Sequence, residues 1–352
     1  MRARPFAGAA VVIFATCAWL VVPVSAQQKQ ENNAPKLDKQ QTQEIQAIIK
    51  YLDDMNAGKA AAPDATLTWQ PYFVKSQGDQ VYVPFTVSLD PGKLTSKAVA
   101  VYFRVVNKAG AAPTAGDKKA AGDKKNDKAP VQFAFEDLMF TDVPPAQKGP
   151  IRVNRAFAVP TGDYDVFMVI RERPVKDQKT APKLALLKES LTIPNLASEL
   201  TTSTIILADK IEAQQAALSR EEQLTQPFTF GGTAITPAAS TSFPKTGELS
   251  LVFFLYNTAV DSANKPNVEV AYNFHRKTAE GEKFFNKTNP QTFDQQTLPP
   301  QFDISKGHQL IAGQSIPLSL FEPGDYRLEI TVTDKTSGKS ITRNVPFTVT
   351  AS

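Results

Sequence analysis

Cysteine and histidine are nearly absent from this chain of 352 residues. It has one cysteine, Cys17, and two histidines, His275 and His308, which lie far apart in the sequence. Cys17 falls in an N-terminal apolar segment that we expect to be removed, which would leave no thiol for catalysis, disulfides or metal binding. Two distant histidines do not indicate a metal site. We therefore expect no metal and no cofactor.

The short motifs of common enzymes are also missing. The sequence contains no His-Glu-x-x-His, no Gly-x-Ser-x-Gly and no P-loop. Glu136 and Asp137 are adjacent carboxylates, but neighbouring residues of a strand point to opposite faces, so the pair would not share a site. We expect no catalytic residues and a chain that is not an enzyme.

The chain lacks a strong excess of either charge. Lysine and arginine total 39 against 35 acidic residues, a net charge of +4. Removing residues 1–26 takes away Arg2 and Arg4, so 37 basic residues remain against 35 and the net charge falls to +2. This balance gives no reason to expect nucleic acid as a partner.

Residues 1–26 have the pattern of a secretory signal peptide. Arg2 and Arg4 precede an apolar stretch over 7–22, and small residues up to Ala26 offer a cleavage site. We predict a cleaved signal and an exported chain, periplasmic or extracellular, with a retained anchor as the alternative. No second run is long enough to cross a bilayer, so the mature chain should have no membrane span.

Residues 27–63 are predicted to form a polar tether and an amphipathic helix. Ile45, Ile48, Ile49, Leu52 and Met55 recur at helical spacing with polar residues between them. We expect this apolar stripe to dock on a domain of the same chain; contact with a partner is the alternative.

Period-two alternation dominates the remainder of the chain. Apolar and polar residues alternate over 81–89 and 98–105, and again over 249–255, 268–274 and 326–333. Such runs are typical of antiparallel sheets with one buried face. We predict an all-β protein with two tandem immunoglobulin- or fibronectin-like β-sandwich domains and a short N-terminal helix. The predicted domains cover 64–196 and 233–352, with a connector over 197–232.

Residues 107–130 interrupt the first predicted domain. This insertion carries six lysines and three aspartates, and its apolar residues are small or proline. Such a segment cannot offset the entropy of ordering, so we expect a disordered loop. A basic docking loop is the alternative.

A short sequence repeats in the two halves. Gly162-Asp163-Tyr164 and Gly324-Asp325-Tyr326 each precede a long strand, at an offset of 162 residues. Glycine permits the tight turn, and the tyrosine hydroxyl can then reach the backbone just upstream. We predict tyrosine corners at Tyr164 and Tyr326; an ordinary strand tyrosine is the alternative.

Carbohydrate binding is the rival to protein interaction. Sugars stack on exposed aromatic rings, and Trp69 lies close to Tyr72 in the first predicted strand. These two residues are the candidate stacking platform. The alternative is that they are core aromatics of that strand.

The turn Pro323-Gly324-Asp325-Tyr326, the strand over 328–334 and the closing Phe347-Thr348-Val349 carry a resemblance. With these, the chain resembles the β-sandwich portions of acidobacterial exported proteins related to the GWxTD and VWFA-related groups. The resemblance implies a sandwich fold in an envelope or secreted setting. We expect a non-enzymatic interaction or scaffold protein of the bacterial cell envelope, with an envelope protein or a glycan as partner.

Overall fold

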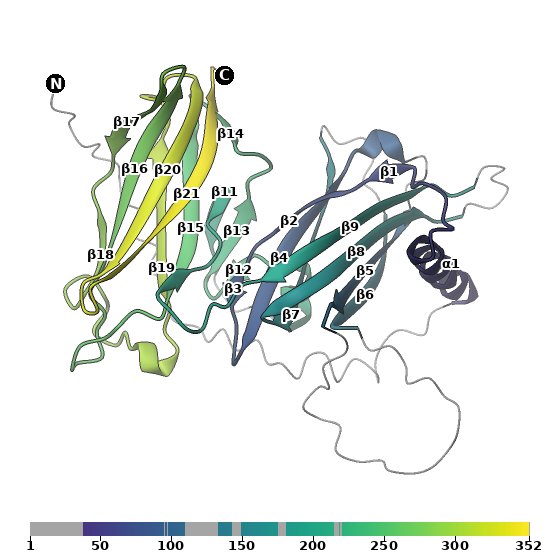
Figure 1. Cartoon of the computed structure of the whole chain (residues 1–352), viewed down its shortest axis with the longest axis horizontal. Coiled ribbons are helices and arrows are strands. Elements are labelled where there is room, and N and C mark those ends of the chain that lie inside the picture. Colours follow the sequence, from purple (N-terminus) through teal and green to yellow (C-terminus); the bar gives the residue numbers. More distant parts are fainter. Residues whose placement is uncertain are drawn as a thin grey trace, which may run out of the picture. The chain divides into compact units, whose positions relative to one another are not determined.

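The computed structural model of the chain is mostly β-strand, as predicted (Figure 1). It describes residues 38–94, 96, 98–109, 133–142, 149–174, 181–214, 218 and 220–351. The expected signal peptide with Cys17, the start of the tether and positions 110–130 of the expected insertion lie outside the described residues. Of the helices in the described part, none is long and apolar enough to cross a membrane.

The described residues form two compact units. The N-terminal unit extends to Pro194, except that it excludes five residues, Tyr72–Ser76. The C-terminal unit consists of Asn195–Ser352 together with this inserted segment. The boundary after Pro194 lies close to the predicted end of the first domain. The inserted segment was predicted inside the first domain and belongs instead to the second unit.

The N-terminal unit is a sandwich of two sheets. One sheet has the order β1-β9-β8-β5-β6, and in the other β4 pairs with β2 and β7. The two sheets face each other, with the ring of Phe85 on β4 5.3 Å from that of Phe103 on β5. The strands are β1 (Ala65–Thr66), β2 (Thr68–Pro71), β4 (Gln80–Leu89), β5 (Ala98–Asn107), β6 (Phe135–Asp142), β7 (Ile151–Pro160), β8 (Gly162–Glu172) and β9 (Leu184–Ile193).

The C-terminal unit is also a sandwich. One sheet has the order β14-β21-β20-β16-β17, with β18 also paired to β16; in the other, β15 pairs with β10, β11 and β19, and β13 and β12 follow β11. Its core is one cluster drawn from both sheets, including Phe253 of β15, Tyr272 of β16 and Tyr326 of β20. The strands are β10 (Thr201–Thr202), β11 (Ile206–Ala213), β12 (Thr229–Phe230), β13 (Thr233–Pro237), β14 (Ser242–Pro244), β15 (Glu248–Tyr256), β16 (Val268–Thr278), β17 (Gly281–Lys287), β18 (Gln291–Phe293), β19 (Leu310–Pro317), β20 (Gly324–Asp334) and β21 (Lys339–Thr350).

Residues 197–232 are part of the second sandwich and not a connector. They supply β10, β11 and β12 and the short helix α2 (Arg220–Thr225). Strand β11 is hydrogen-bonded on both edges, to β15 and β13, and Ile206 is fully buried. Its later residues are exposed and charged, which gave this stretch a helix-like composition.

The two sandwiches repeat one arrangement. In each unit a short strand lies parallel to the last strand, β1 on β9 and β14 on β21. In both Gly-Asp-Tyr turns the glycine has positive φ, 153° at Gly162 and 145° at Gly324, which disfavours any side chain. The aspartate of each turn accepts a hydrogen bond from a threonine of the last strand, at 2.6 Å from Thr192 and 2.7 Å from Thr348.

Both tyrosines make the predicted corner bond. The hydroxyl of Tyr164 donates to the Pro160 carbonyl at 3.0 Å, and that of Tyr326 donates to the Glu322 carbonyl at 2.8 Å. Each bond reaches four residues back along the chain, and each ring is buried. Burial raises the pKa of both hydroxyls, so they remain protonated donors at neutral pH. The short repeat in the sequence therefore marks a repeated structural device.

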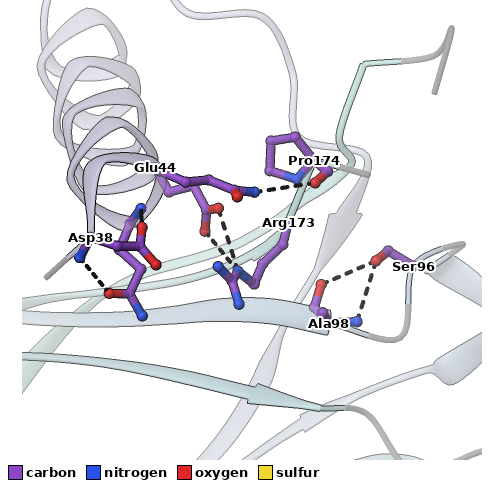
Figure 2. A network of polar contacts seen from close by, with 8 residues as sticks. Asp38, Glu44, Ser96, Ala98, Arg173 and Pro174 are labelled. Carbon is purple, nitrogen blue, oxygen red and sulfur yellow. Dashed lines mark hydrogen bonds and ion pairs between the residues drawn. The ribbon is translucent and has the colours of Figure 1, made fainter. Parts of the chain in front are cut away.

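Helix α1 (Lys39–Asn56) docks on the N-terminal unit, as predicted for its apolar stripe. Ile48 and Leu52 pack against Tyr102, Phe167 and other residues on the outer face of β5, β8 and β9. Asp38 and Gln41 form a reciprocal capping box that begins the helix. Figure 2 shows a further anchor, in which the buried carboxylate of Glu44 pairs with Arg173 at 3.2 Å. Docking thus combines apolar burial with one ion pair.

Candidate interaction surface

The outer face of the five-stranded sheet differs between the two units. Aligning Tyr164 with Tyr326 places Phe167 opposite Glu329 and Val169 opposite Thr331. Phe167 and Val169 contribute to the apolar face that α1 covers. In the C-terminal unit the matching positions are polar, and Thr342, the strand partner of Thr331, is exposed. The outer sheet face is therefore polar in the C-terminal unit and apolar in the N-terminal unit.

We call this surface of the C-terminal unit the polar face. Alternation along β20 turns Leu328 and Ile330 into the core and Arg327, Glu329 and Thr331 outward. The register of the sheet then fixes their neighbours on the adjacent strands. The residues that define the polar face are Asn273 and His275 of β16, Glu282 and Phe284 of β17, Arg327, Glu329 and Thr331 of β20, and Thr342 and Asn344 of β21.

Arg327 lies at the centre of a hydrogen-bonded network on the polar face. Its Nε donates to Glu282 at 2.8 Å, and its Nη1 donates to Glu329 at 3.0 Å and to Asn344 at 2.6 Å. Asn273 Nδ2 donates to the other oxygen of Glu329 at 3.5 Å. Four strands thus hold five planar polar groups in fixed orientations.

The network also fixes the charges of its members. Hydrogen bonds to Glu282 and Glu329 raise the pKa of Arg327. The hydrogen bond from Arg327 lowers the pKa of Glu329 below its ordinary value. Arg327 and Glu329 are therefore ionised at neutral pH. Lys277 at the edge of the face is exposed.

An aromatic pair borders the network. Phe284 is 52% exposed, and its ring lies edge-on to His275 with centroids 6.0 Å apart. His275 lies beside Arg327 in the register of β16 and β20. His275 is half-buried, and its buried Nε2 has no hydrogen-bond partner in the part of the chain that the structure describes. His275 Nε2 lies 3.8 Å from Glu329 Oε1.

The predicted stacking pair is divided between the two units. Trp69 lies on β2 of the N-terminal unit, half-buried, with its indole donating to Glu189 at 2.7 Å and its ring edge-on to Phe85. Tyr72 belongs to the C-terminal unit and is only 2% exposed, with its ring edge-on to Phe228 at 5.4 Å. A buried ring has no face for a sugar, so the expectation for Tyr72 is corrected to a core role.

Tyr72 is buried because the inserted segment packs into its unit. The backbone N–H of Thr204 donates a hydrogen bond to the Phe73 carbonyl at 3.0 Å, and the backbone N–H of Lys75 donates to the Tyr256 hydroxyl at 3.1 Å. Val74 is also buried. The segment is therefore a structural part of the C-terminal unit.

Glu136 and Asp137 point to different surroundings, as strand geometry requires. Glu136 accepts hydrogen bonds from Tyr102 and Arg104, whereas Asp137 lies 3.7 Å from Arg155. Within the described residues no group of three or more histidine, aspartate, glutamate or cysteine side chains is placed to hold a metal ion.

Sequence reasoning identified only part of the polar face. Alternation had placed Asn273 and His275 on the polar side of one strand and Arg327 and Glu329 on that of another. It gave no sign that these groups form one network, because their contacts depend on register. Phe284 was missed because Phe285 interrupts the pairing of β17 as a bulge, so that two adjacent aromatics hide the alternation.

Comparison with known proteins adds little to this description. No family model and no curated protein matches the chain. Among solved structures, a crystal structure of a Salmonella alpha-2-macroglobulin mutant is similar at 12% sequence identity and a TM-score of 0.20. The match covers 83% of this chain and 17% of that one, and at this TM-score it carries no argument. The resemblance to exported acidobacterial sandwich proteins stays a prediction.

Proposed function

We propose that the chain is an exported, non-enzymatic interaction or scaffold protein of the bacterial cell envelope, and that the polar face is its recognition surface. The signal-like residues 1–26 support export. The observation that carries the proposal is the contrast between the two outer faces. The same sheet face is apolar and covered by α1 in one unit, and polar, networked and bordered by an exposed Phe284 in the other.

A networked face suits recognition because its groups are already oriented. Arg327, Glu329 and Asn344 hold one another, so a ligand would not have to immobilise three long side chains. Their position on central strands gives a more rigid platform than a loop would. The N-terminal unit, with its docked helix, would then serve as the spacer of a scaffold.

A pull-down from native envelope extract tests this proposal, with the purified chain as bait. Thr331→Arg places a bulky charge at the centre of the polar face without touching the core. The matched control is Thr236→Arg, the same change at an exposed threonine of the other sheet. We expect wild type and Thr236→Arg to recover the same component and Thr331→Arg to lose it. Equal recovery by all three baits would contradict the proposal.

The alternative function is a carbohydrate-binding module, for which the sequence suggested Trp69 and Tyr72 as the stacking residues. The burial of Tyr72 removes that pair as a platform. The polar face supports carbohydrate as a ligand class independently of them.

A further inference from the structure

We propose that the polar face binds an uncharged oligosaccharide, with one sugar ring stacked on Phe284 and its neighbours hydrogen-bonded along β20 toward Asn344. This inference rests on the proposed function and names the ligand of its recognition surface. The juxtaposition of one exposed aromatic ring with a planar polar array is what points to a sugar, because a pyranose has an apolar face and a rim of hydroxyls.

Phe284 supplies the stacking platform. It is one of three large apolar residues that are exposed among those described, and it alone of them lies on the polar face. The ring of His275 lies edge-on beside it, with the centroids 6.0 Å apart. Adjacent strands lie about 4.8 Å apart, so the backbones of Phe284 and Arg327 are separated by about 10 Å across two strand spacings. A short oligosaccharide can bridge that separation.

The network still offers free hydrogen-bonding atoms. Among the described residues, nothing bonds Arg327 Nη2, Asn344 Nδ2 or Asn273 Oδ1, although each group is held through its other atoms. These atoms provide donors from two strands and an acceptor from a third. A sugar hydroxyl both donates and accepts, so this mixture suits adjacent hydroxyls better than it suits a phosphate or a carboxylate.

The charge balance favours a neutral ligand. Arg327 is already paired with Glu282 and Glu329, so an anion would meet two carboxylates at the centre of the face. A protein partner would be expected to bury a larger apolar patch with several aromatic anchors. The polar face has one exposed aromatic residue. Edge pairing with a partner strand is also disfavoured, because the bulge at Phe285 and the lysines of β17 protect that edge.

Affinity electrophoresis of the full chain tests the proposal. The native gels contain soluble neutral polysaccharides, one at a time: mixed-linkage β-glucan, xylan, galactomannan and dextran. The variants are Phe284→Ala and Asn344→Ala, and the matched control is Leu320→Ala, which truncates a 62% exposed apolar residue of the same unit away from the polar face. Circular dichroism and a thermal midpoint establish that each variant is folded.

We expect at least one polysaccharide to retard the wild type and Leu320→Ala equally. Phe284→Ala should weaken binding about tenfold, the effect of one lost aromatic stacking contact. Asn344→Ala should weaken it as well. Retardation that Phe284→Ala leaves unchanged would overturn the assignment. If no polysaccharide retards the wild type while Thr331→Arg still abolishes recovery of a protein from envelope extract, the sugar proposal fails and the proposed function stands. If neither measurement responds to the polar face, both fail.

Discussion

Replacing Tyr326 by phenylalanine tests how the repeated turn stabilises each sandwich. The ring is fully buried against Phe321 and Phe347, with centroids 5.2 Å and 5.4 Å away, and phenylalanine keeps those contacts. The change removes only the 2.8 Å bond to the Glu322 carbonyl. Because Glu322 is exposed, its carbonyl can bond water instead, so the cost is that of one ordinary hydrogen bond, about 1 kcal/mol.

The assay is thermal and urea unfolding of the chain that begins at Gln27, followed by far-ultraviolet circular dichroism. We expect Tyr326→Phe to lower the midpoint by about 2–4 °C, the shift for a cooperative unit of this size. Tyr326→Ala also removes the ring and should cost about 3–5 kcal/mol. Tyr164→Phe provides the parallel test in the N-terminal unit, where Trp69 fluorescence reports unfolding. An unchanged midpoint for Tyr326→Phe, alongside a large loss for Tyr326→Ala, would show that the corner bond contributes nothing.

Three further predictions concern buried polar groups. Glu44→Gln should weaken docking of α1 by about 1–2 kcal/mol, because Arg173 is only partly exposed to water and would lose its charged partner. Limited proteolysis of the helix measures the docking, and Asp53→Asn, a change at an exposed carboxylate of the same helix, is the control. Burial alone would raise the pKa of Asp334, but hydrogen bonds from Ala259 and from residues of the 334–339 turn lower it. Asp334→Asn should therefore cost about 1–3 kcal/mol at neutral pH, and the difference in unfolding free energy from wild type should shrink as the pH falls through that lowered pKa. Burial raises the pKa of Tyr272 and Tyr326, so the stability these hydroxyls contribute is present below about pH 10 and is lost as the pH rises further. In a pH titration, the tyrosinate absorbance of these two residues should increase only above the ordinary pKa of about 10, and together with the loss of β-sheet signal.

Local patterns predicted much of the fold. Alternation identified β16 and β20 because each has one face in a core, and helical spacing identified α1. It also identified β4, β5 and β15, but the expectation of one buried face is wrong for them, because most residues on both faces of these strands are buried. The Gly-Asp-Tyr repeat predicted both corners, since a positive-φ glycine and a tyrosine four residues beyond the bonded carbonyl leave a recognisable trace.

The errors arose where long-range packing decides the structure. The inserted segment has an ordinary strand composition, and nothing local shows that Tyr72 packs with Phe228, some 150 residues away in the sequence. The residues of strand β11 were assigned to a connector because only the first three of them are buried. The polar face was only partly anticipated, because its network is created by the register of four strands.

Oxidative footprinting of Phe284 tests the central claim most directly. The full chain is labelled by hydroxyl radicals when free and when bound to a native envelope fraction. Oxidation of Phe284 is compared with that of Leu320, a 62% exposed apolar side chain of the same unit. The account predicts that binding protects Phe284 and leaves Leu320 unchanged. Equal oxidation of Phe284 in the free and bound states would contradict it.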